Sequence, residues 1–152
     1  MPRVSGVVTT LDNGATLDAC LASLAWCDER VVLDSGSTDA TLAIAARHGA
    51  RIAQQPFAGY GLQKQAAIDL ASGEWILLLD ADEHLTDAGR AAIQRELAAP
   101  RADGYRLPRQ EWLFWRWAHP RSRANWQLRL FRKAVGRMNA VPVHAAPVVD
   151  GY

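Results

Sequence analysis

The sequence has no apolar run long enough to span a membrane and too few cysteines for a disulfide framework. Its strongest apolar run, Trp75 to Leu79, has the length of a strand, whereas a membrane helix needs about 18 or more apolar residues. Cys20 and Cys27 lack the paired spacing of a zinc site, and we expect Cys20 to be a small hydrophobic residue on a helix. The residues after Met1 lack the layout of a signal peptide, so we expect a cytoplasmic protein.

Internal repeats and low-complexity segments are also absent. The 11 glycines and 7 prolines follow no period, and 49% of the 152 residues are apolar, which excludes collagen-like and disordered chains. A chain of this length and composition predicts one folded domain.

Charge is divided unevenly along the chain, although the net charge is only +1. Residues 1–100 carry 7 basic and 13 acidic side chains, whereas residues 101–152 carry 10 basic and 3 acidic ones. The second stretch also holds four of the six tryptophans: Trp112, Trp115, Trp117 and Trp126. We therefore expect two parts of one domain, an acidic part over 1–100 and a basic, Trp-rich part over 101–152.

Hydrophobic patterning predicts alternating strands and helices up to Pro100. We expect strands over 4–10, 30–33, 51–54 and 74–79, and helices over 15–24, 38–48, 61–71 and 86–98, the last capped by Thr86. This alternation predicts an α/β fold with a mostly parallel sheet and helices on both faces. In the basic part we expect strands over 105–107 and 127–131, where Leu128 and Leu130 alternate with Arg129.

Asp34 is the first candidate binding residue. Ligands of open α/β sheets bind where the strands end, and Asp34 opens the small polar loop Asp34-Ser35-Gly36-Ser37-Thr38-Asp39 after the second predicted strand. An acid there can accept hydrogen bonds from a ribose or a base. The structural alternative is helix capping by Ser37 or Asp39, which we favour for Asp39 and not for Asp34.

A second acidic group, Asp80-Ala81-Asp82-Glu83, follows the buried strand that ends at Leu79. On an extended backbone Asp80 and Asp82 would point the same way, and their carboxylates would repel each other without a cation between them. Oxygen ligands suit Mg²⁺ or Mn²⁺, which can also bind the phosphates of a substrate. The structural alternative is a solvated acidic turn that caps the next helix.

Several other motifs can be tested against these residues. The chain has no phosphate loop that ends in Gly-Lys-Ser/Thr, and Gly59-Tyr60-Gly61 is too short for a dinucleotide fingerprint. An EF-hand from Asp80 fails because Leu85 and Ala91 stand where Gly and Glu are needed. A phosphatase with Asp80 as its covalent nucleophile stays open, although His84 stands where such enzymes have Thr or Val.

Lys64 is placed at the start of the predicted helix over 61–71. A cation in the first turn of a helix is unfavourable against the helix dipole. We interpret this placement as a sign that an anion, such as a diphosphate, is the partner of Lys64. A purely structural role for Lys64 is the alternative.

These segments together resemble a known family. The stretch from Asp34 to Thr41, the stretch from Phe57 to Lys64 and the stretch from Trp75 to Glu83 occur in the order and spacing of inverting glycosyltransferases of family 2. The resemblance is to the branch of lipopolysaccharide core glucosyltransferases, and it extends through Arg129-Leu130-Phe131-Arg132 to Val143-His144.

The resemblance implies a GT-A, Rossmann-like fold that binds a nucleotide sugar, usually a UDP-sugar, together with Mg²⁺ or Mn²⁺. It implies that Thr9 and Asp34 contact the nucleoside and that Lys64 contacts the diphosphate. Asp80 would contact the ribose or the metal, and Asp82 the metal.

The sequence departs from the family pattern at three places. Asp12-Asn13 stands where the family has Asn-Glu, and Ala145 follows His144 where the family has Glu, the plausible catalytic base. His144 is then the remaining candidate for that base. Family members continue beyond the position of Tyr152, so we expect a truncated member.

The basic, Trp-rich part supports three interpretations. Its tryptophans can be core residues with solvated arginines around them, or the segment can contact an anionic membrane on the acceptor side. Nucleic-acid binding is disfavoured because the rest of the domain is acidic. We expect a glycan or lipid-linked acceptor, and peripheral contact with the inner face of the plasma membrane.

These observations predict a metal-dependent inverting glycosyltransferase that moves a sugar from a nucleotide sugar to a cell-envelope acceptor, such as lipopolysaccharide core. Two other classes stay open at this point. One is a fragment that binds the nucleotide sugar without turnover, and the other is the phosphatase that uses Asp80.

Overall fold

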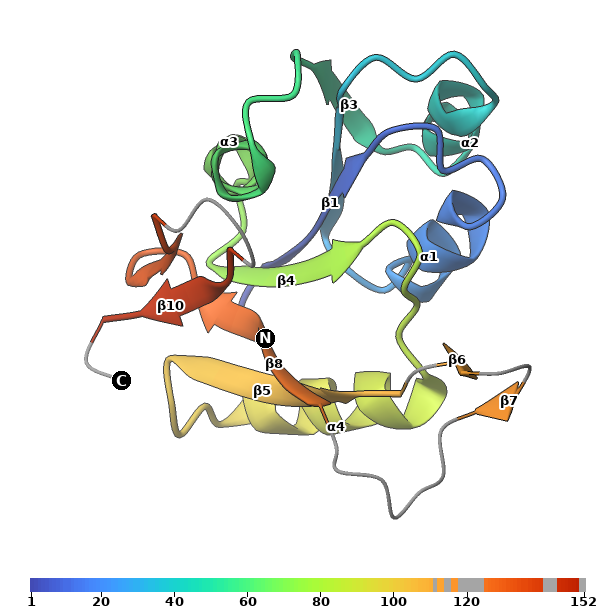
Figure 1. Ribbon diagram of the computed structural model, residues 1–152. Helices are drawn as coiled ribbons and strands as arrows, with labels where there is room; N and C mark the ends of the chain where they lie inside the picture. Colours follow the sequence, from blue (N-terminus) through green and yellow to red (C-terminus); the bar gives the residue numbers. More distant parts are fainter. Residues whose placement is uncertain (111, 114–115, 118–124, 141–144, 151–152) are drawn as a thin grey trace.

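The structure is a computed structural model that describes residues 1–110, 112–113, 116–117, 125–140 and 145–150. Figure 1 shows the helices and strands along the chain. Their bounds are β1 (Val4–Thr10), α1 (Leu17–Ser23), β2 (Glu29–Asp34), α2 (Thr41–Arg47), β3 (Arg51–Gln54), α3 (Tyr60–Leu70), β4 (Trp75–Asp80), α4 (Asp87–Ala98), β5 (Gly104–Arg109), β6 (Trp112–Leu113), β7 (Arg116–Trp117), β8 (Asn125–Arg132), β9 (Gly136–Met138) and β10 (Pro147–Val149).

The main sheet has six strands in the order β3-β2-β1-β4-β8-β5. The first four are parallel to one another, β8 runs antiparallel to β4, and β5 runs antiparallel to β8. A short antiparallel pair, β9 and β10, and a second one, β6 and β7, lie outside this sheet. The mostly parallel α/β sheet that the hydrophobic pattern predicts is confirmed.

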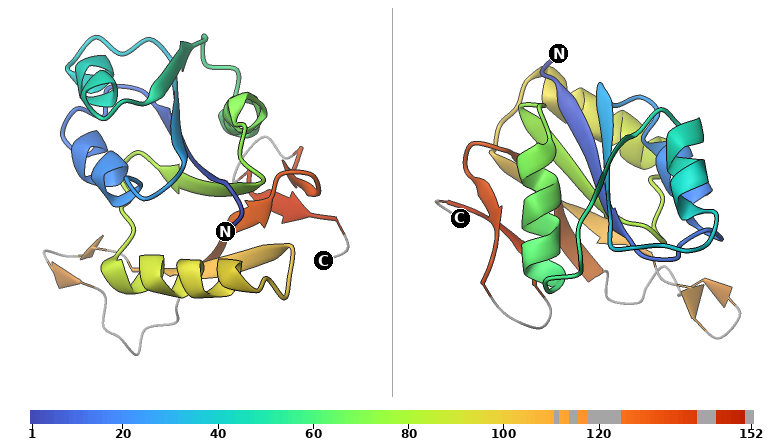
Figure 2. Two further views of the ribbon diagram at one scale, coloured as in Figure 1. Left: turned by 180° about the vertical axis from the view of Figure 1, so that it is seen from behind. Right: turned by 90° about the horizontal axis from the view of Figure 1, so that it is seen from above.

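Helices cover both faces of the sheet, as expected. Figure 2 shows α3 on one side of the strands and α1, α2 and α4 on the other. Two buried clusters match these two layers. One joins residues of α1, α2 and α4 to the sheet, and the other joins α3, β9 and β10 to the opposite face.

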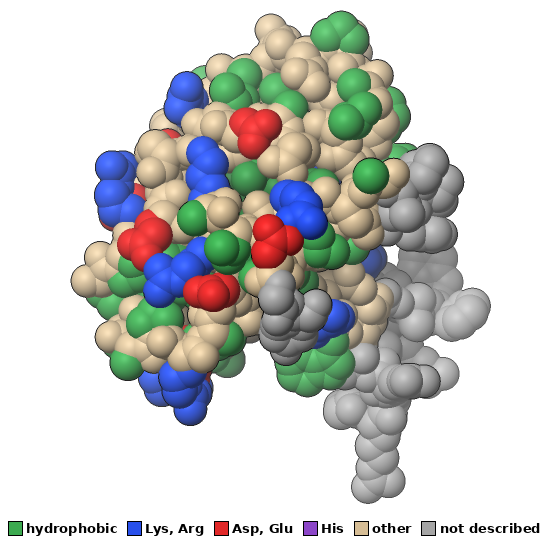
Figure 3. All heavy atoms as spheres, turned by 90° about the vertical axis from the view of Figure 1, so that its left-hand side faces the viewer, with side chains coloured by type: hydrophobic (Ala, Val, Ile, Leu, Met, Phe, Trp, Pro, Cys, Tyr) green, Lys and Arg blue, Asp and Glu red, His purple; other side chains and the backbone are tan. Residues whose placement is uncertain are grey.

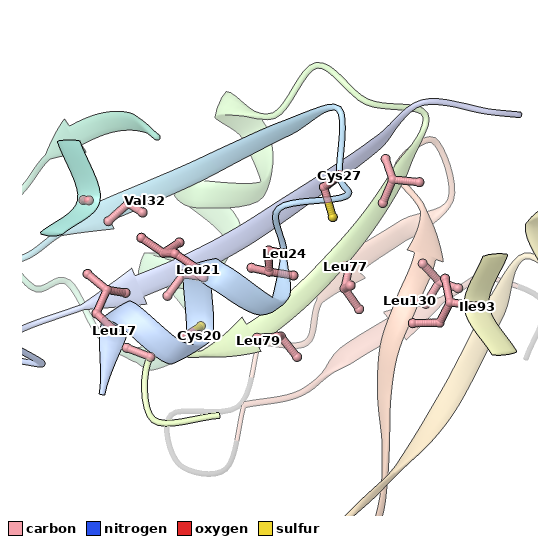
Figure 4. Close-up of a cluster of buried hydrophobic side chains, with 14 of the residues drawn as sticks. Leu17, Cys20, Leu21, Leu24, Cys27, Val32, Leu77, Leu79, Ile93 and Leu130 are labelled. Carbon is pink, nitrogen blue, oxygen red and sulfur yellow. The ribbon is translucent and has the colours of Figure 1, made fainter. Parts of the chain in front are cut away.

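The larger cluster is built around α1 and the centre of the sheet. Figure 4 shows Leu17 and Leu21 of α1 near Val32 of β2, with Leu77 and Leu79 of β4 further along the sheet and Ile93 of α4 beside Leu130 of β8. Cys20 is fully buried there, as expected for a small hydrophobic residue, and burial raises the pKa of its thiol to about 12. Burying one large apolar side chain contributes roughly 1.5–3 kcal/mol, so this layer holds the strands in place.

Strand β4 is the most buried element because it lies in the middle of the sheet with layers on both faces. Trp75, Ile76, Leu77 and Leu78 each have no exposed surface. A strand that is buried on both faces reads as a continuous apolar run, which explains why this segment was the clearest strand in the sequence. Its first position that is not buried is Asp80, at the carboxyl end.

Two strands of the basic part extend the main sheet. Strand β8 pairs directly with β4, so that Leu77 lies opposite Leu130, and β5 forms the edge beyond it. The part after Pro100 thus shares the core of the first part, since Leu130 and Phe131 are fully buried. The division at residue 100 remains a prediction about function.

Within the described residues, we find no helix that combines the length and apolar character needed to cross a membrane.

Candidate functional site

The carboxyl ends of three parallel strands bring the predicted polar residues to one edge of the sheet. Thr9 of β1 lies beside Asp80 of β4, and the adjacent Thr10 lies beside Asp34 of β2 in the strand register. Asp34 and Asp80 therefore flank the end of β1 on its two sides. This is the edge at which open α/β sheets bind ligands.

Asp34 is buried at this edge and its carboxylate is well supplied with hydrogen-bond donors. Oδ2 accepts the backbone N–H groups of Gly36 and Ser37, both at 2.9 Å, and Oδ1 accepts the Ser37 hydroxyl at 2.5 Å. Gly36 has a φ of 107°, a conformation that a residue with a Cβ rarely adopts, so glycine permits this tight turn. Burial raises the pKa of Asp34, but the hydrogen bonds from Ser37 and Gly36 outweigh it and hold the pKa below its usual value.

The loop after β1 is tied to the loop after β2, a link that sequence reasoning missed. Asp12, with a φ of 50°, accepts the Thr38 N–H at 2.8 Å, and its own N–H donates to the Ser37 hydroxyl at 2.8 Å. Asp39 accepts the N–H groups of Gly14 and Thr41, so its contacts are structural, but it is not the expected helix cap, because the N-cap residue of α2 is Ala40. The positive φ at Asp12 leaves no signal in a hydrophobic pattern.

Asp80 lies between two cations. Lys64 Nζ of α3 lies 2.6 Å from Oδ1, and an Arg129 guanidinium nitrogen of β8 lies 3.3 Å from Oδ2. Burial raises the pKa of Asp80, whereas the charges of Lys64 and Arg129 lower it, and the net pKa is below its usual value. Asp80 is therefore an ionised carboxylate with both oxygens engaged.

Glu83 closes the turn that follows β4, which we call the acidic turn (residues 80–83). Its Oε2 accepts the Asp80 N–H at 3.0 Å, and its own N–H donates to the Asp80 carbonyl at 2.9 Å. Arg129 donates to Glu83 Oε1 at 2.7 Å, and Arg109 Nε lies 3.6 Å from the same oxygen. The alternation with Leu128 and Leu130 placed Arg129 on the other face of its strand. It did not predict that Arg129 would pair with the acidic turn.

Asp82 is exposed, and the described residues provide no hydrogen bond or ion pair to its carboxylate. The expectation that Asp80 and Asp82 point the same way assumed an extended backbone, and that premise is wrong. Strand β4 ends at Asp80, and the chain turns at Ala81, which is buried. The turn forms here because Glu83 bonds back to the Asp80 N–H.

The acidic turn fits a divalent cation only together with a phosphate ligand. Among the described residues, no group of three or more His, Cys, Asp or Glu side chains is arranged to hold a metal ion. Magnesium, however, is commonly bound by one or two carboxylates, with substrate phosphates and water as the other ligands. Asp82, exposed, and Asp80, ionised, meet that smaller requirement.

Lys64 lies one residue further into its helix than expected. Helix α3 begins at Tyr60, so Lys64 falls in the second turn, where the helix dipole has little effect. The helix dipole is therefore the wrong reason to expect an anionic partner for Lys64. The partner that the structure gives Lys64 is the carboxylate of Asp80.

A buried glutamine fixes the loop that leads into α3. Gln63 is 2% exposed, accepts the Ala58 N–H at 3.3 Å and donates to the Ser35 hydroxyl at 3.1 Å. It thereby joins the loop before α3 to the loop that carries Asp34. The neighbouring Phe57 and Tyr60 rings are exposed and meet edge to face, with 5.1 Å between their centroids.

His144, the candidate catalytic base, lies outside the described residues. The next residue is described. Ala145 packs beside the first turn of α3, since a Cβ built on Gly61 would lie 3.1 Å from the Ala145 Cβ. The position at which the family has Glu is therefore next to the helix that carries Lys64.

The basic, Trp-rich part is only partly described. Trp126 on β8 is 53% exposed, whereas Trp115 and the side chains of Trp112 and Trp117 lie outside the description. Figure 3 shows the face over α3 and the β9–β10 pair, where basic and acidic side chains of described residues lie close together. Arg137 and Asp150, paired across β9 and β10, are an example.

Comparison with known families shows which class of protein this chain is. A sequence model described as "Glycosyl transferase family 2" matches residues 5–146. The chain belongs to glycosyl transferase family 2. The match includes all the predicted site residues: Thr9, Asp34, Lys64, Asp80, Asp82 and His144.

Curated family 2 relatives are longer than this chain. The lipopolysaccharide core biosynthesis glycosyltransferase LpsC of Rhizobium meliloti (strain 1021) is 35% identical over 156 residues, which is 97% of this chain and 58% of LpsC. An uncharacterized glycosyltransferase of Rickettsia felis is 36% identical over 106 residues, 69% of this chain and 38% of that protein. The chain thus spans less than two thirds of the length of these relatives.

Solved structures show the same fold. S. aureus TarS (residues 1–349), crystallised in complex with UDP-GlcNAc, has a TM-score of 0.60 and 25% identity over 68% of this chain and 33% of TarS. Glucosyl-3-phosphoglycerate synthase of M. tuberculosis has a TM-score of 0.55 and 25% identity over 66% of this chain and 42% of that one. The GT-A fold that the resemblance implied is confirmed.

Proposed function

We propose that the protein is a glycosyltransferase that moves a sugar from a nucleotide sugar, of the UDP-sugar class, to an acceptor with inversion at the anomeric carbon. One observation carries the proposal. Asp34, Lys64 and Asp80, three residues that the family resemblance assigns to the donor, come together at the carboxyl ends of β1, β2 and β4. The UDP-GlcNAc complex of the similar TarS supports the choice of donor class.

The nucleoside would bind at the ends of β1 and β2. Thr9 is half-buried there, and Asp34 is held as a charged hydrogen-bond acceptor by Gly36 and Ser37. A carboxylate in this state accepts hydrogen bonds from ribose or base donors without first losing a proton. We assign the nucleoside contacts to Thr9 and Asp34.

The diphosphate would bind between Lys64 and the acidic turn. In the structure without ligand, Lys64 neutralises Asp80 at 2.6 Å. A diphosphate offers Lys64 a second anion, and Arg129 can keep Asp80 neutralised when Lys64 turns to it. We assign the diphosphate contact to Lys64.

Mg²⁺ or Mn²⁺ would be held by Asp82 and Asp80 together with the diphosphate. When bound, such an ion offsets the charge that develops on the leaving diphosphate. Lys64 supplies a positive charge to the same group from the other side, which is electrostatic catalysis by a fixed charge.

The remaining step is the removal of a proton from the acceptor hydroxyl that attacks the sugar. The family position for the base is Ala145 in this chain, so we assign His144 as the remaining candidate, because imidazole titrates near neutral pH. The name of the similar LpsC supports a cell-envelope glycan or lipid-linked acceptor such as lipopolysaccharide core. With that acceptor, we propose a cytoplasmic protein that contacts the anionic inner face of the membrane and binds no nucleic acid.

The test is a calorimetric titration with UDP, with and without Mn²⁺, followed by an assay for UDP released from UDP-sugars. We expect UDP to bind more tightly with Mn²⁺ and uridine to bind equally in both conditions. A phosphomonoester assay is the control for the phosphatase alternative, and hydrolysis through Asp80 would contradict the proposal. Failure to bind any nucleoside diphosphate would also contradict it.

A further inference from the structure

Arg129 is a buried cation at this edge of the sheet. Its side chain is 8% exposed, and it stands between Leu128 and Leu130 on β8, the strand that pairs with β4. A buried guanidinium needs partners, because an unpaired charge in the interior is strongly unfavourable. Among the described residues it pairs with Asp80 at 3.3 Å and Glu83 at 2.7 Å, both in the acidic turn.

The acidic turn concentrates negative charge where an anionic donor would bind. Asp80, Asp82 and Glu83 place three carboxylates within four residues. Lys64 lies beside one of them and is the residue that we assign to the diphosphate. Once Lys64 contacts the donor, Arg129 stays with Asp80, and it stays with Glu83 alongside Arg109.

We propose that Arg129 is a positioning residue of the donor site, which bridges Asp80 and Glu83 so that the acidic turn accepts an anionic ligand. One guanidinium bonds to both carboxylates, and Glu83 in turn holds the Asp80 N–H at 3.0 Å. The bridge fixes the shape of the turn and cancels part of its charge. Asp82 is left outside the bridge, exposed and available for a cation.

This inference rests on the proposed function, because it concerns the binding of the same donor. It adds a residue from β8, a strand of the basic part, to the donor site formed by β1, β2 and β4. The basic part would thus contribute to donor binding as well as to acceptor contacts.

The test compares UDP with uridine, since only UDP brings negative charge to the acidic turn. Arg129→Met should weaken UDP binding by about tenfold to a hundredfold, the effect of losing hydrogen bonds to charged groups, and uridine binding by less than about threefold. Arg129→Lys keeps the charge but moves it away from the position of the guanidinium nitrogen that contacts both carboxylates, so we expect a UDP loss of about threefold to tenfold.

A double variant separates charge from simple damage. The double variant combines Glu83→Gln with Arg129→Met and so removes one of the carboxylates that Arg129 neutralises. UDP should therefore bind more tightly to the double variant than to the single variant Arg129→Met. If Arg129→Met does not fold, Arg129→Lys is measured in its place. We then expect Arg129→Lys to bind UDP more weakly than the wild type and uridine equally well.

The matched control is Arg132→Met. Arg132 lies three residues further along β8 and pairs with Glu74 and Asp103, away from the acidic turn. It should change thermal stability and leave UDP binding unchanged.

Three results would overturn the inference while the proposed function stands: wild-type UDP affinity in the Arg129 variants, equal losses for UDP and uridine, or an equal UDP loss in Arg132→Met. A wild-type protein that binds no UDP would overturn both.

Discussion

The Lys64 ammonium already has an anion beside it, because Asp80 Oδ1 lies 2.6 Å away. A donor diphosphate therefore has to attract Lys64 away from Asp80 or share it. We expect Lys64→Ala to weaken UDP binding by about tenfold to a hundredfold, the effect of losing a hydrogen bond between charged groups, and to leave uridine binding nearly unchanged. Titration calorimetry with both ligands measures the difference, and Lys133→Ala, whose ammonium bonds to carbonyls at the end of α3, is the control. Equal losses for the two ligands would make Lys64 a structural residue.

Asp82 differs from Asp80 because the described residues leave its carboxylate exposed and without a partner. Its substitution should therefore cost little stability. We expect Asp82→Asn to remove the increase in UDP affinity that Mn²⁺ produces, and to unfold at the wild-type temperature within about 2 °C, as surface substitutions do. Asp87→Asn, an exposed acid in the first turn of α4, is the matched control. An unchanged Mn²⁺ effect in Asp82→Asn would refute the metal role.

Among the elements, the start of β2 is joined to β1 and to the loop before β4 by one carboxylate. Glu29 Oε1 accepts the Ser5 hydroxyl at 2.5 Å, the Ser72 hydroxyl at 2.9 Å and the Ser72 N–H. Burial raises the pKa of Glu29, but these hydrogen bonds outweigh it and lower the pKa below its usual value. Because the folded state favours the charged form, the stabilisation is complete above the unfolded-state pKa of about 4.3. It is lost as the pH falls through the lower folded-state pKa.

From this linkage we expect Glu29→Gln to lower the free energy of unfolding by about 1 kcal/mol at pH 7, the contribution of charge to such hydrogen bonds. The loss should shrink as the pH falls below about 4.3, because the Glu29 carboxyl of the unfolded wild type then takes up a proton. Urea unfolding of both proteins at pH 7 and near pH 3 measures it. A loss of equal size at the two pH values would mean that packing, not charge, is responsible.

The elements also show what sequence reasoning reached. Strand β4 and the Thr86 cap of α4, whose hydroxyl oxygen accepts the Gly89 N–H at 3.0 Å, follow from local patterns and were predicted. The pairing of β8 with β4 was not, because antiparallel insertion of a strand from the basic part depends on contacts distant in sequence. The burial of Arg129 was missed for the same reason. An arginine between two leucines predicts a solvated face, and only the acidic turn across the sheet makes that face buried.

For the molecule as a whole, donor binding and transfer can be separated. The residues that we assign to the donor lie on elements that the structure describes, at the ends of β1, β2 and β4 and on α3. The place of Asp34 at the end of its strand was predicted from the sequence, whereas the predicted partner of Lys64 was a diphosphate and the structure pairs it with Asp80. The candidate base, His144, was predicted only from the family resemblance, and it lies outside the described residues.

Turnover should therefore be the weak property of this chain. Ala145 stands where the family resemblance implies the catalytic base. General-base catalysis contributes about 10²–10⁴-fold. We therefore expect UDP-sugar to bind with Mn²⁺, and transfer to a lipid-linked core acceptor to be slower by that factor than in a relative with Glu at this position.

Ala145→Glu would place the carboxyl beside the first turn of α3, near Gly61, and should recover only part of the rate, because the acceptor also has to be positioned. UDP release and product formation, measured together in both proteins, test this. Transfer by the unaltered chain at the rate of such a relative would contradict the expectation and assign the base to Glu83, Glu111 or His144.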